Sequence, residues 1–225
     1  MNAATFVSGS HIAASALNSQ VWEEQLFLVK LNQAVALLLL CALSPLFLII
    51  ALFIWQRDGA PILYGHYRVG RGGKLFRCLK FRTMLRDSER LLTDLLRDDA
   101  NSRAEWKLHQ KLLNDPRITP IGRFLRSSSL DELPQLMNVL RGEMLLVGPR
   151  PVTVVELTRY GMVRWHYLSV RPGITGLWQI SGRNNTTYEE RVALDARYVE
   201  NRSLRSDLGI LLRTILVVIL RDGAR

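Results

Sequence analysis

The residues with the clearest chemical potential in this sequence are two adjacent acids, Asp131 and Glu132. Pro134 follows closely, and proline is tolerated in a helix only within its first turn. Both acids are therefore expected at or next to a helix N-terminus, in a helix that runs from about Glu132 to Leu140. Two interpretations of the pair follow, one structural and one chemical.

The structural interpretation is helix capping. Asp is a favoured N-cap residue, and Ser129 and Glu132 have the spacing of a capping box. Acids in a first turn also interact favourably with the helix dipole. Capping would account for both acids without any chemistry.

The chemical interpretation is phosphoryl transfer. A helix N-terminus keeps an Asp carboxylate ionised, as a carboxylate nucleophile must be, and it offers backbone N–H groups to a phosphate. Glu132 can hold Mg²⁺, which proteins bind through carboxylates together with substrate phosphates. A carboxylate, a metal and nearby cations would position the phosphoryl group and neutralise its charge.

Three arginines on stiff turns fit the chemical interpretation. Arg150 lies between two prolines, Arg171 precedes a Pro-Gly pair, and Arg183 follows a glycine. A guanidinium on a restricted backbone suits bidentate phosphate contacts, although each arginine could equally form a surface ion pair. The sequence has no P-loop, GxGxxG, HExxH or GxSxG motif, so the commonest NTPase, dinucleotide, zinc-protease and hydrolase classes lack support.

The elements that must position these residues are short. Turn residues alternate with β-rich runs over residues 59–83 and predict a hairpin, and residues 144–147 predict a short strand. Helical patterns fall in four further segments: 87–113, 119–126, 188–198 and 208–220. The last of these is too short to span a membrane and is expected to be interfacial. Together they predict an α+β fold that is mostly helical.

An apolar block precedes all of these elements. Ala34–Trp55 contains 22 residues without a charge, and as a helix it would measure ~33 Å, enough to cross a hydrocarbon core of ~30 Å. Pro45 at its centre predicts a bend, and Ser44 can donate to the carbonyl that the proline leaves free. Two topologies stay open: a kinked spanning helix, or a helix that leaves on the side it entered.

A basic segment follows the apolar block. Between Arg57 and Arg82 the formal net charge is +6. The positive-inside rule then places the C-terminal body of the chain in the cytosol. Such a segment is attracted to anionic headgroups, so membrane lipids are expected partners.

Composition limits the class of protein further. The 225 residues include 48% hydrophobic residues, which excludes a disordered or low-complexity chain, and two cysteines exclude a disulfide framework. The formal charge of +10 favours an anionic partner. That charge would also suit a non-catalytic, membrane-anchored basic module that binds nucleic acid or acidic partners. Because the sequence has no recognised nucleic-acid motif, we expect no nucleic-acid partner.

Several long motifs, in order, resemble the bacterial sugar transferase family, the monotopic phosphoglycosyl transferases. The resemblance covers residues 34 to about 220. The motifs are LKFRTM, NDPRITPIGRFLR, SLDELPQLMNVLRGEMLLVGPRP, RPGITGLWQISGRN and YEERVALDARYVEN. The chain departs from the family at Leu145, where members often have Ser. It also has no long N-terminal hydrophobic region, which indicates the short, catalytic-domain form.

The resemblance implies a reaction. Members transfer a sugar 1-phosphate from a UDP-sugar to undecaprenyl phosphate and release UMP. This transfer begins exopolysaccharide, capsule or O-antigen assembly. The remaining alternative is a transferase that moves the sugar alone to a lipid and so releases UDP. By resemblance, Asp131 is the nucleophile that forms a covalent phosphosugar intermediate, Glu132 binds the required Mg²⁺, and Lys80 belongs to the same site. The membrane element is implied to be re-entrant and bent at Ser44 and Pro45, with both ends cytosolic.

The expected organisation is an N-terminal extension (1–30), a re-entrant membrane helix (31–57) and a catalytic domain (58–225) on the cytosolic face of a bacterial inner membrane. The helical insert with its NDPR sequence favours a hexose as the sugar. Whether the chain forms a homodimer stays open. From charge and position rather than from the family, we assign five arginines to phosphate or nucleotide contacts: Arg82, Arg126, Arg150, Arg171 and Arg183.

Overall fold

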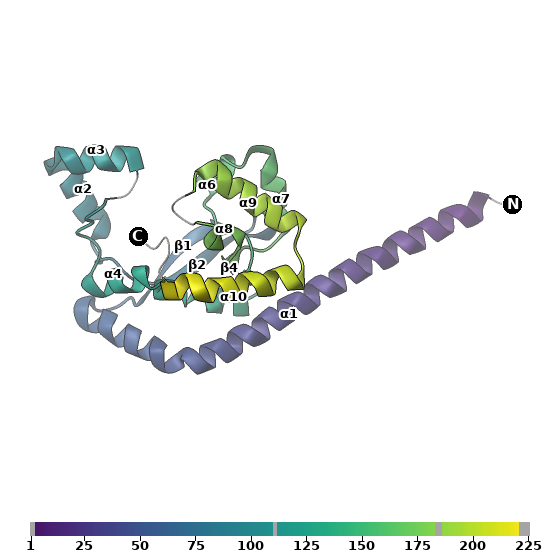
Figure 1. The fold of residues 1–225 in the computed structure, drawn as a ribbon, viewed down its shortest axis with the longest axis horizontal. Helices are drawn as coiled ribbons and strands as arrows, with labels where there is room; N and C mark the ends of the chain where they lie inside the picture. Colours follow the sequence, from purple (N-terminus) through teal and green to yellow (C-terminus); the bar gives the residue numbers. More distant parts are fainter. Residues whose placement is uncertain (1–2, 110–111, 183–185, 221–225) are drawn as a thin grey trace.

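The structure of the chain, a computed structural model, describes residues 3–109, 112–182 and 186–220. Within these ranges, side chains are described for residues 26–108, 112–182 and 186–217. A long N-terminal helix runs along a domain of shorter helices and two small sheets (Figure 1). The predicted class, α+β and mostly helical, is confirmed.

The N-terminal helix α1 (Ala3–Asp58) contains the whole apolar block. Pro45 has no N–H to offer the carbonyl oxygen of Cys41, and the Ser44 hydroxyl donates to that oxygen at 2.8 Å. Figure 1 shows the helix changing direction in the blue part of the ribbon. Within the described residues, Leu26–Asp58 is the one helical segment long and apolar enough to cross a membrane.

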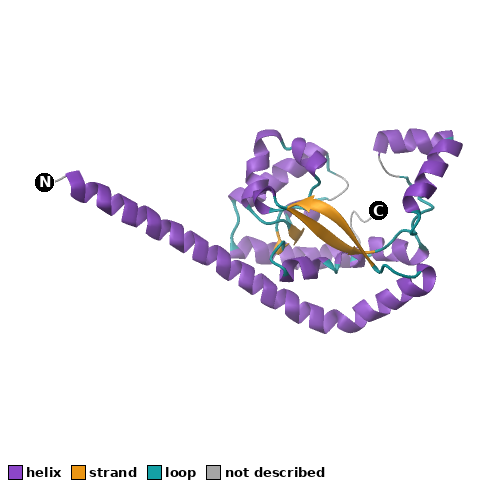
Figure 2. Ribbon diagram, turned by 180° about the vertical axis from the view of Figure 1, so that it is seen from behind, coloured by secondary structure: helices purple, strands orange, loops and turns teal. Residues whose placement is uncertain are grey.

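The predicted hairpin is confirmed. Strands β1 (Leu63–Val69) and β2 (Leu75–Phe81) pair antiparallel, with Leu63 opposite Phe81, and the short 3-10 helix η1 (Arg71–Gly73) connects them. Figure 2 shows the two strands crossing the middle of the domain. One strand of this hairpin, β2, carries Lys80.

A second, parallel pair of strands joins two motifs that are distant in sequence. Strand β3 (Leu145–Val147) lies beside β4 (Gly173–Thr175). The backbones approach so closely beyond β3 that a Cβ on Gly173 would collide with the backbone nitrogen of Gly148. Glycine is required at this contact, which fixes the turn that carries Arg150 against the segment that begins at Arg171.

The remaining elements are helices, most of them short. They are α2 (Ser88–Asp98), α3 (Ala100–His109), α4 (Pro120–Ser127), η2 (Leu130–Glu132), α5 (Gln135–Leu140), α6 (Val154–Thr158), η3 (Gly161–Val163), α7 (Arg164–Ser169), α8 (Leu177–Ile180), α9 (Tyr188–Glu200) and α10 (Leu204–Leu220). The predicted cap of α4 is confirmed, because the Thr119 hydroxyl accepts from the Gly122 N–H at 2.9 Å.

The predicted helix over residues 87–113 is wrong in its extent. The segment 87–113 was expected to form a single helix, and the structure divides it into α2 and α3 at Asp99. Asp99 has an extended backbone, and its carboxylate accepts from the N–H groups of Asn101 and Ser102. Asp99 therefore caps a new helix, because a short acidic side chain competes well for the orphan N–H groups of a first turn.

One face of α1 belongs to the core of the domain. Ala36 packs with Phe76 of β2 in one cluster, and Ile54 packs with Phe81 and Leu125 in another. The two ends of this stretch are also tied by polar contacts. The Asn32 side chain accepts from the Leu146 N–H, and Asp58 forms an ion pair with Arg82.

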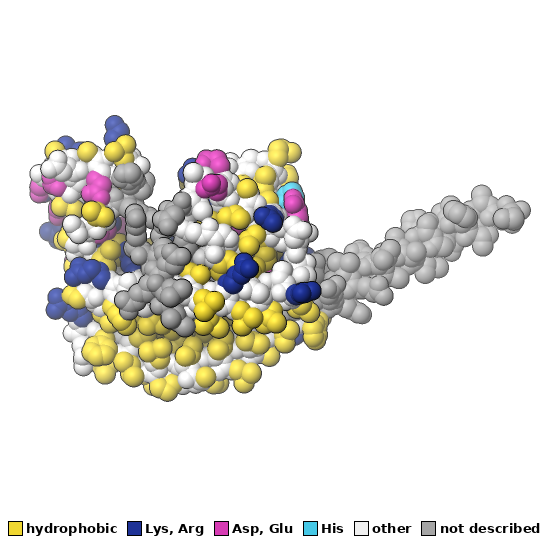
Figure 3. Space-filling view, in the orientation of Figure 1, with side chains coloured by type: hydrophobic (Ala, Val, Ile, Leu, Met, Phe, Trp, Pro, Cys, Tyr) yellow, Lys and Arg dark blue, Asp and Glu magenta, His cyan; other side chains and the backbone are white. Residues whose placement is uncertain are grey.

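The opposite face of α1 is apolar and exposed. Leu38 and Leu48 are 69% and 71% exposed, and α10 adds exposed leucines of its own. Figure 3 shows hydrophobic side chains gathered along the lower edge of the molecule, below most of the Lys and Arg residues on that face. An apolar surface of this extent marks a site of membrane or partner contact.

Candidate active site

Asp131 lies in the single 3-10 turn η2, and the capping interpretation of this segment is wrong. Ser129 has a left-handed backbone with φ 58° and makes no capping hydrogen bond through its side chain. The helix α5 begins at Gln135 rather than at Glu132, because Pro134 occupies its N-cap position. The acids therefore precede α5 and are available for contacts outside it.

Lys80 brings the two acids together. Its Nζ lies 3.3 Å from Asp131 Oδ2 and 2.6 Å from Glu132 Oε1. The strand β2 supplies Lys80, and η2 supplies both acids. One carboxylate oxygen of each acid thus contacts the same ammonium group. Asp131 itself is buried, with 7% of its surface exposed.

Burial and the neighbouring charges act on the pKa of Asp131 in opposite directions. Burial raises the pKa of Asp131, the charge of Lys80 lowers it, and the neighbouring Glu132 raises it, with a net rise above the ordinary value. This direction is opposite to the one expected from a helix N-terminus. Lys80 and Arg126, rather than a helix dipole, favour the ionised form of Asp131.

Two of the five predicted phosphate-binding arginines lie beside this cluster. The Arg126 Nε donates to the Thr83 hydroxyl at 2.9 Å, and its charge acts on Asp131. The Arg150 guanidinium lies 3.8 Å from Glu132 Oε1 and 5.4 Å from the centre of the Trp178 ring. Both guanidinium groups are thus held near the acids by additional contacts.

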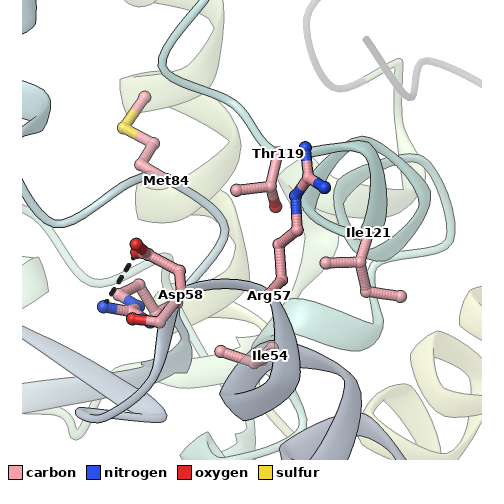
Figure 4. Close-up of a pocket in the computed structure, with 7 residues that line it drawn as sticks. Ile54, Arg57, Asp58, Met84, Thr119 and Ile121 are labelled. Carbon is pink, nitrogen blue, oxygen red and sulfur yellow. Dashed lines mark hydrogen bonds and ion pairs between the residues drawn. The ribbon is translucent and has the colours of Figure 1, made fainter.

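Arg82 is placed differently from our expectation. Its guanidinium donates to the carbonyl oxygens of Asp58 and Gly59 and pairs with the Asp58 carboxylate at 3.2 Å. These contacts satisfy the C-terminal end of α1 and tie it to the strand that carries Lys80. Figure 4 shows Asp58 beside a small hollow into which Arg57 extends towards Thr119.

Arg171 is also not part of the cluster. Arg171 Nε donates to the carbonyl oxygen of Gly142 at 2.8 Å, and the charges that act on it are those of Arg71 and Arg202. Arg183 lies outside the described residues. Within the described part of the chain, the candidate site is therefore built from Lys80 and the two acids, flanked by two arginines.

Comparison with known proteins identifies the family of this chain. The family model described as bacterial sugar transferase matches residues 24–221. The chain belongs to the bacterial sugar transferase family. The family resemblance of the motifs is thus confirmed over nearly the whole chain.

Three relatives illustrate the range of the family. A UDP-galactose-lipid carrier transferase of Erwinia amylovora is 56% identical over 79% of this chain and 37% of its own length. An undecaprenyl-phosphate galactose phosphotransferase of Salmonella typhimurium is 52% identical over 84% of this chain and 40% of its own. The exopolysaccharide production protein ExoY of Sinorhizobium fredii is 50% identical over 84% of both chains. This chain therefore spans well under half of the first two relatives and most of the third.

Asn138 is a supporting residue that sequence reasoning missed. It is fully buried in α5; its Oδ1 accepts from the Leu79 N–H at 2.9 Å, and its Nδ2 donates to the Arg77 carbonyl at 2.8 Å. It thereby pairs the free edge of β2 as a third strand would. A polar residue inside the apolar run LMNVL was the signal available for it.

Asp195 of α9 was also missed, although its motif was recognised. It is 2% exposed and its Oδ2 accepts from the Tyr160 hydroxyl at 2.8 Å. Burial raises its pKa to about 6, and the Tyr160 hydrogen bond and the charges of Arg191 and Arg150 act against that rise. Through Arg150 this acid is coupled to the candidate site.

The acids fit a magnesium ion of the substrate-bound kind. Among the described residues no group of three or more His, Cys, Asp or Glu side chains forms a closed metal site. Mg²⁺ with a phosphate substrate needs only one or two carboxylates, since phosphate oxygens and waters complete its shell. The convergence of Asp131 and Glu132 on the Lys80 Nζ provides donors of that type.

Proposed function

We propose that this chain transfers a sugar 1-phosphate, with a hexose as the sugar, from a UDP-sugar to undecaprenyl phosphate and releases UMP. The observation that carries the proposal is the convergence of Asp131 and Glu132 on Lys80, at 3.3 Å and 2.6 Å, with Arg150 beside them. Relatives named as lipid-carrier and undecaprenyl-phosphate transferases of galactose support the substrate classes. The ExoY relative supports a role in exopolysaccharide assembly.

In the first proposed step Asp131 acts as the nucleophile. A carboxylate oxygen attacks the phosphorus that carries the sugar, and the bond from this phosphorus to the bridging oxygen breaks. UMP leaves with that oxygen, and the sugar 1-phosphate stays on Asp131 as an acyl phosphate. Lys80 and Arg126 stabilise the attacking anion, and Arg150 neutralises charge on the diphosphate.

In the second proposed step the acceptor lipid takes the sugar 1-phosphate from Asp131. A phosphate oxygen of undecaprenyl phosphate attacks the same phosphorus, and the bond to Asp131 breaks. The carboxylate is regenerated and the sugar leaves on a lipid diphosphate. One site can therefore serve a water-soluble donor and a lipid acceptor in turn.

Glu132, with Asp131, is the residue we expect to hold Mg²⁺. When bound together with the donor, the ion would neutralise diphosphate charge. In that state Lys80 would keep its contact with Asp131 and so hold the nucleophile in its attacking orientation.

The test measures which nucleotide is released. Membranes containing the full chain, undecaprenyl phosphate and Mg²⁺ are supplied with UDP-glucose, UDP-galactose or their N-acetylated relatives. We expect UMP with one of the hexose donors, and mass spectrometry with donor alone should find a phosphosugar on Asp131. The half-exposed Asp94 on α2 provides a control, since Asp94→Asn should keep full activity while Asp131→Asn loses it. Release of UDP would instead indicate sugar transfer and overturn the proposal.

We further propose that α1 enters and leaves the membrane on the cytosolic side. Asn32 near one end of the apolar stretch and Asp58 at the other both contact the same domain. A straight span would carry these two ends to opposite faces of the bilayer, whereas the bend at Pro45 lets both stay with the domain. The basic segment after Asp58 supports the cytosolic face.

Cysteine labelling tests this topology. In a chain with Cys41 and Cys78 replaced by Ser, single cysteines at the exposed positions Lys30 and Gln56 are probed with a membrane-impermeant reagent. Both should react in inside-out vesicles and neither in intact cells. Labelling of position 30 from outside the cell would establish a spanning helix.

A further inference from the structure

A second group of basic residues lies apart from the candidate active site. Three arginines line one open hollow with about 310 Å³ of empty space: Arg71, Arg171 and Arg202. They come from η1, from the turn before β4 and from the connection between α9 and α10. None of the described residues that line this hollow is acidic. We call it the arginine pocket.

The charges of Arg171 and Arg202 are only partly compensated. Arg202 lies 3.9 Å from the Asp207 carboxylate, which also accepts from the Tyr198 hydroxyl at 2.8 Å. Arg171 uses its Nε on a backbone carbonyl. Burial lowers the pKa of Arg171, and the like charges of Arg71 and Arg202 lower it further. An arrangement of this kind is unfavourable when empty and favourable around an anion.

Apart from Ser169, the remaining lining residues of the arginine pocket are apolar. Leu28 and Val29 of α1 line it, next to Leu26 and Phe27, which are 60% and 61% exposed. On the other side α10 begins two residues after Arg202, with the exposed Leu204. The pocket therefore opens where the exposed apolar surface of two helices meets arginine side chains.

We propose that the arginine pocket binds the phosphodiester group of an anionic phospholipid such as phosphatidylglycerol, with the acyl chains along Leu28 and α10. Guanidinium groups match phosphate oxygens in bidentate geometry, and a lipid phosphate lies at the boundary that the pocket occupies. Phosphatidylcholine carries the same phosphodiester, but its own cation competes with the arginines. A free phosphate would use the arginines without the apolar wall.

This inference does not rest on the proposed transfer reaction. The pocket shares no lining residue with the Lys80, Asp131 and Glu132 cluster. It would hold the N-terminal part of the apolar helix at headgroup level, while the clamp between Arg82 and Asp58 holds the other end. A lipid in the pocket would thus fix the depth of the domain at the membrane.

Spin-labelled lipids provide the test. The full chain is reconstituted in phosphatidylcholine vesicles with a trace of spin-labelled phosphatidylglycerol or phosphatidylcholine, and the motionally restricted fraction gives the relative association constant. We expect the wild-type chain to prefer phosphatidylglycerol. The double variant Arg71→Gln/Arg202→Gln should weaken that preference by roughly 30-fold, since each arginine beside the bound lipid phosphate would contribute about fivefold.

Matched variants separate the pocket from general attraction to charge. Arg205→Gln/Arg213→Gln removes two exposed arginines of α10 outside the pocket and should change the preference less than about threefold. An equal loss in both double variants would overturn the proposal. So would displacement of the labelled lipid by inorganic phosphate at constant ionic strength, which would assign the pocket to a free anion. Asp131→Asn should keep the preference, and its loss there would place the lipid at the active site instead.

Discussion

Asp115 and Asp131 are two aspartates with nearly the same exposure, 8% and 7%, and opposite surroundings. The Asp115 carboxylate accepts from both Nε and Nη2 of Arg117, at 2.8 and 2.6 Å, in a bidentate pair. Asp131 shares a single ammonium with Glu132 and lies farther from it than Glu132 does. One acid is fully paired and the other is not.

The pKa values of the two acids follow these surroundings. Burial raises the pKa of both carboxyls, but the hydrogen bonds and charge of Arg117 outweigh it at Asp115 and leave that pKa below its ordinary value. At Asp131 burial and Glu132 prevail over Lys80, and the pKa is raised. A buried acid left under-compensated is unfavourable for stability, so such an acid points to chemistry, whereas a fully paired one points to architecture.

Exchanging each acid for its amide should produce the largest contrast. Asp131→Asn is expected to lower turnover by at least ~10⁴-fold, as loss of a nucleophile does, and to change the free energy of unfolding by less than about 1 kcal/mol. Asp115→Asn leaves the Arg117 charge buried without its partner, which should lower the free energy of unfolding by about 3 kcal/mol. Denaturant unfolding and UMP release, measured on the same preparations, give both quantities.

One result would contradict this contrast between Asp115 and Asp131. Activity per folded molecule of the Asp115→Asn variant should stay within about threefold of wild type. If Asp115→Asn lost turnover as completely as Asp131→Asn while remaining folded, the division into an architectural and a chemical aspartate would be wrong. The double variant Asp115→Asn/Arg117→Met, which removes both charges, should regain part of the lost stability.

Local signals in the sequence predicted several features of the fold. The hairpin, the Thr119 cap and the bend at Pro45 each depend on residues within a few positions of one another, and all three are present. The break at Asp99 is local as well, but the pattern of leucines across 87–113 concealed a cap that the acid itself could have indicated.

The candidate site was less predictable because its geometry is not local. The local pattern predicted an Asp131 ionised by a helix N-terminus. Its partner Lys80, which only the family resemblance assigned to the same site, is 51 positions away in β2. Arg82 and Arg171 carry the same charge as Arg150, but only the packing of α1 and β4 decides which anion or carbonyl each one contacts. Charge and turn residues can therefore suggest that an arginine binds phosphate, but they do not determine where its guanidinium lies.

The last prediction concerns the cations that favour the Asp131 anion. Only ionised Asp131 can attack, so kcat/KM should fall as the pH decreases through the pKa of this group. Lys80 is the stronger of the two neighbouring cations that lower that pKa, and Lys80→Met should move the acid limb of the profile to higher pH. Arg126→Gln should move it in the same direction by a smaller amount.

The exposed Lys107 on α3 supplies the matched control, because Lys107→Met removes the same charge far from any contact with Asp131 in the described structure. Its acid limb should coincide with that of wild type. An unchanged or lowered limb in Lys80→Met would mean that Lys80 serves Glu132 alone, to which it is closer.

The raised pKa of Asp131 also has a consequence for stability, because the folded chain holds this proton more tightly than the unfolded chain does. The free energy of unfolding should therefore fall as the pH rises from the pKa of the unfolded chain to that of the folded chain, and Lys80→Met should widen this pH interval. At Asp115, whose pKa is lowered, stability is lost on acidification instead.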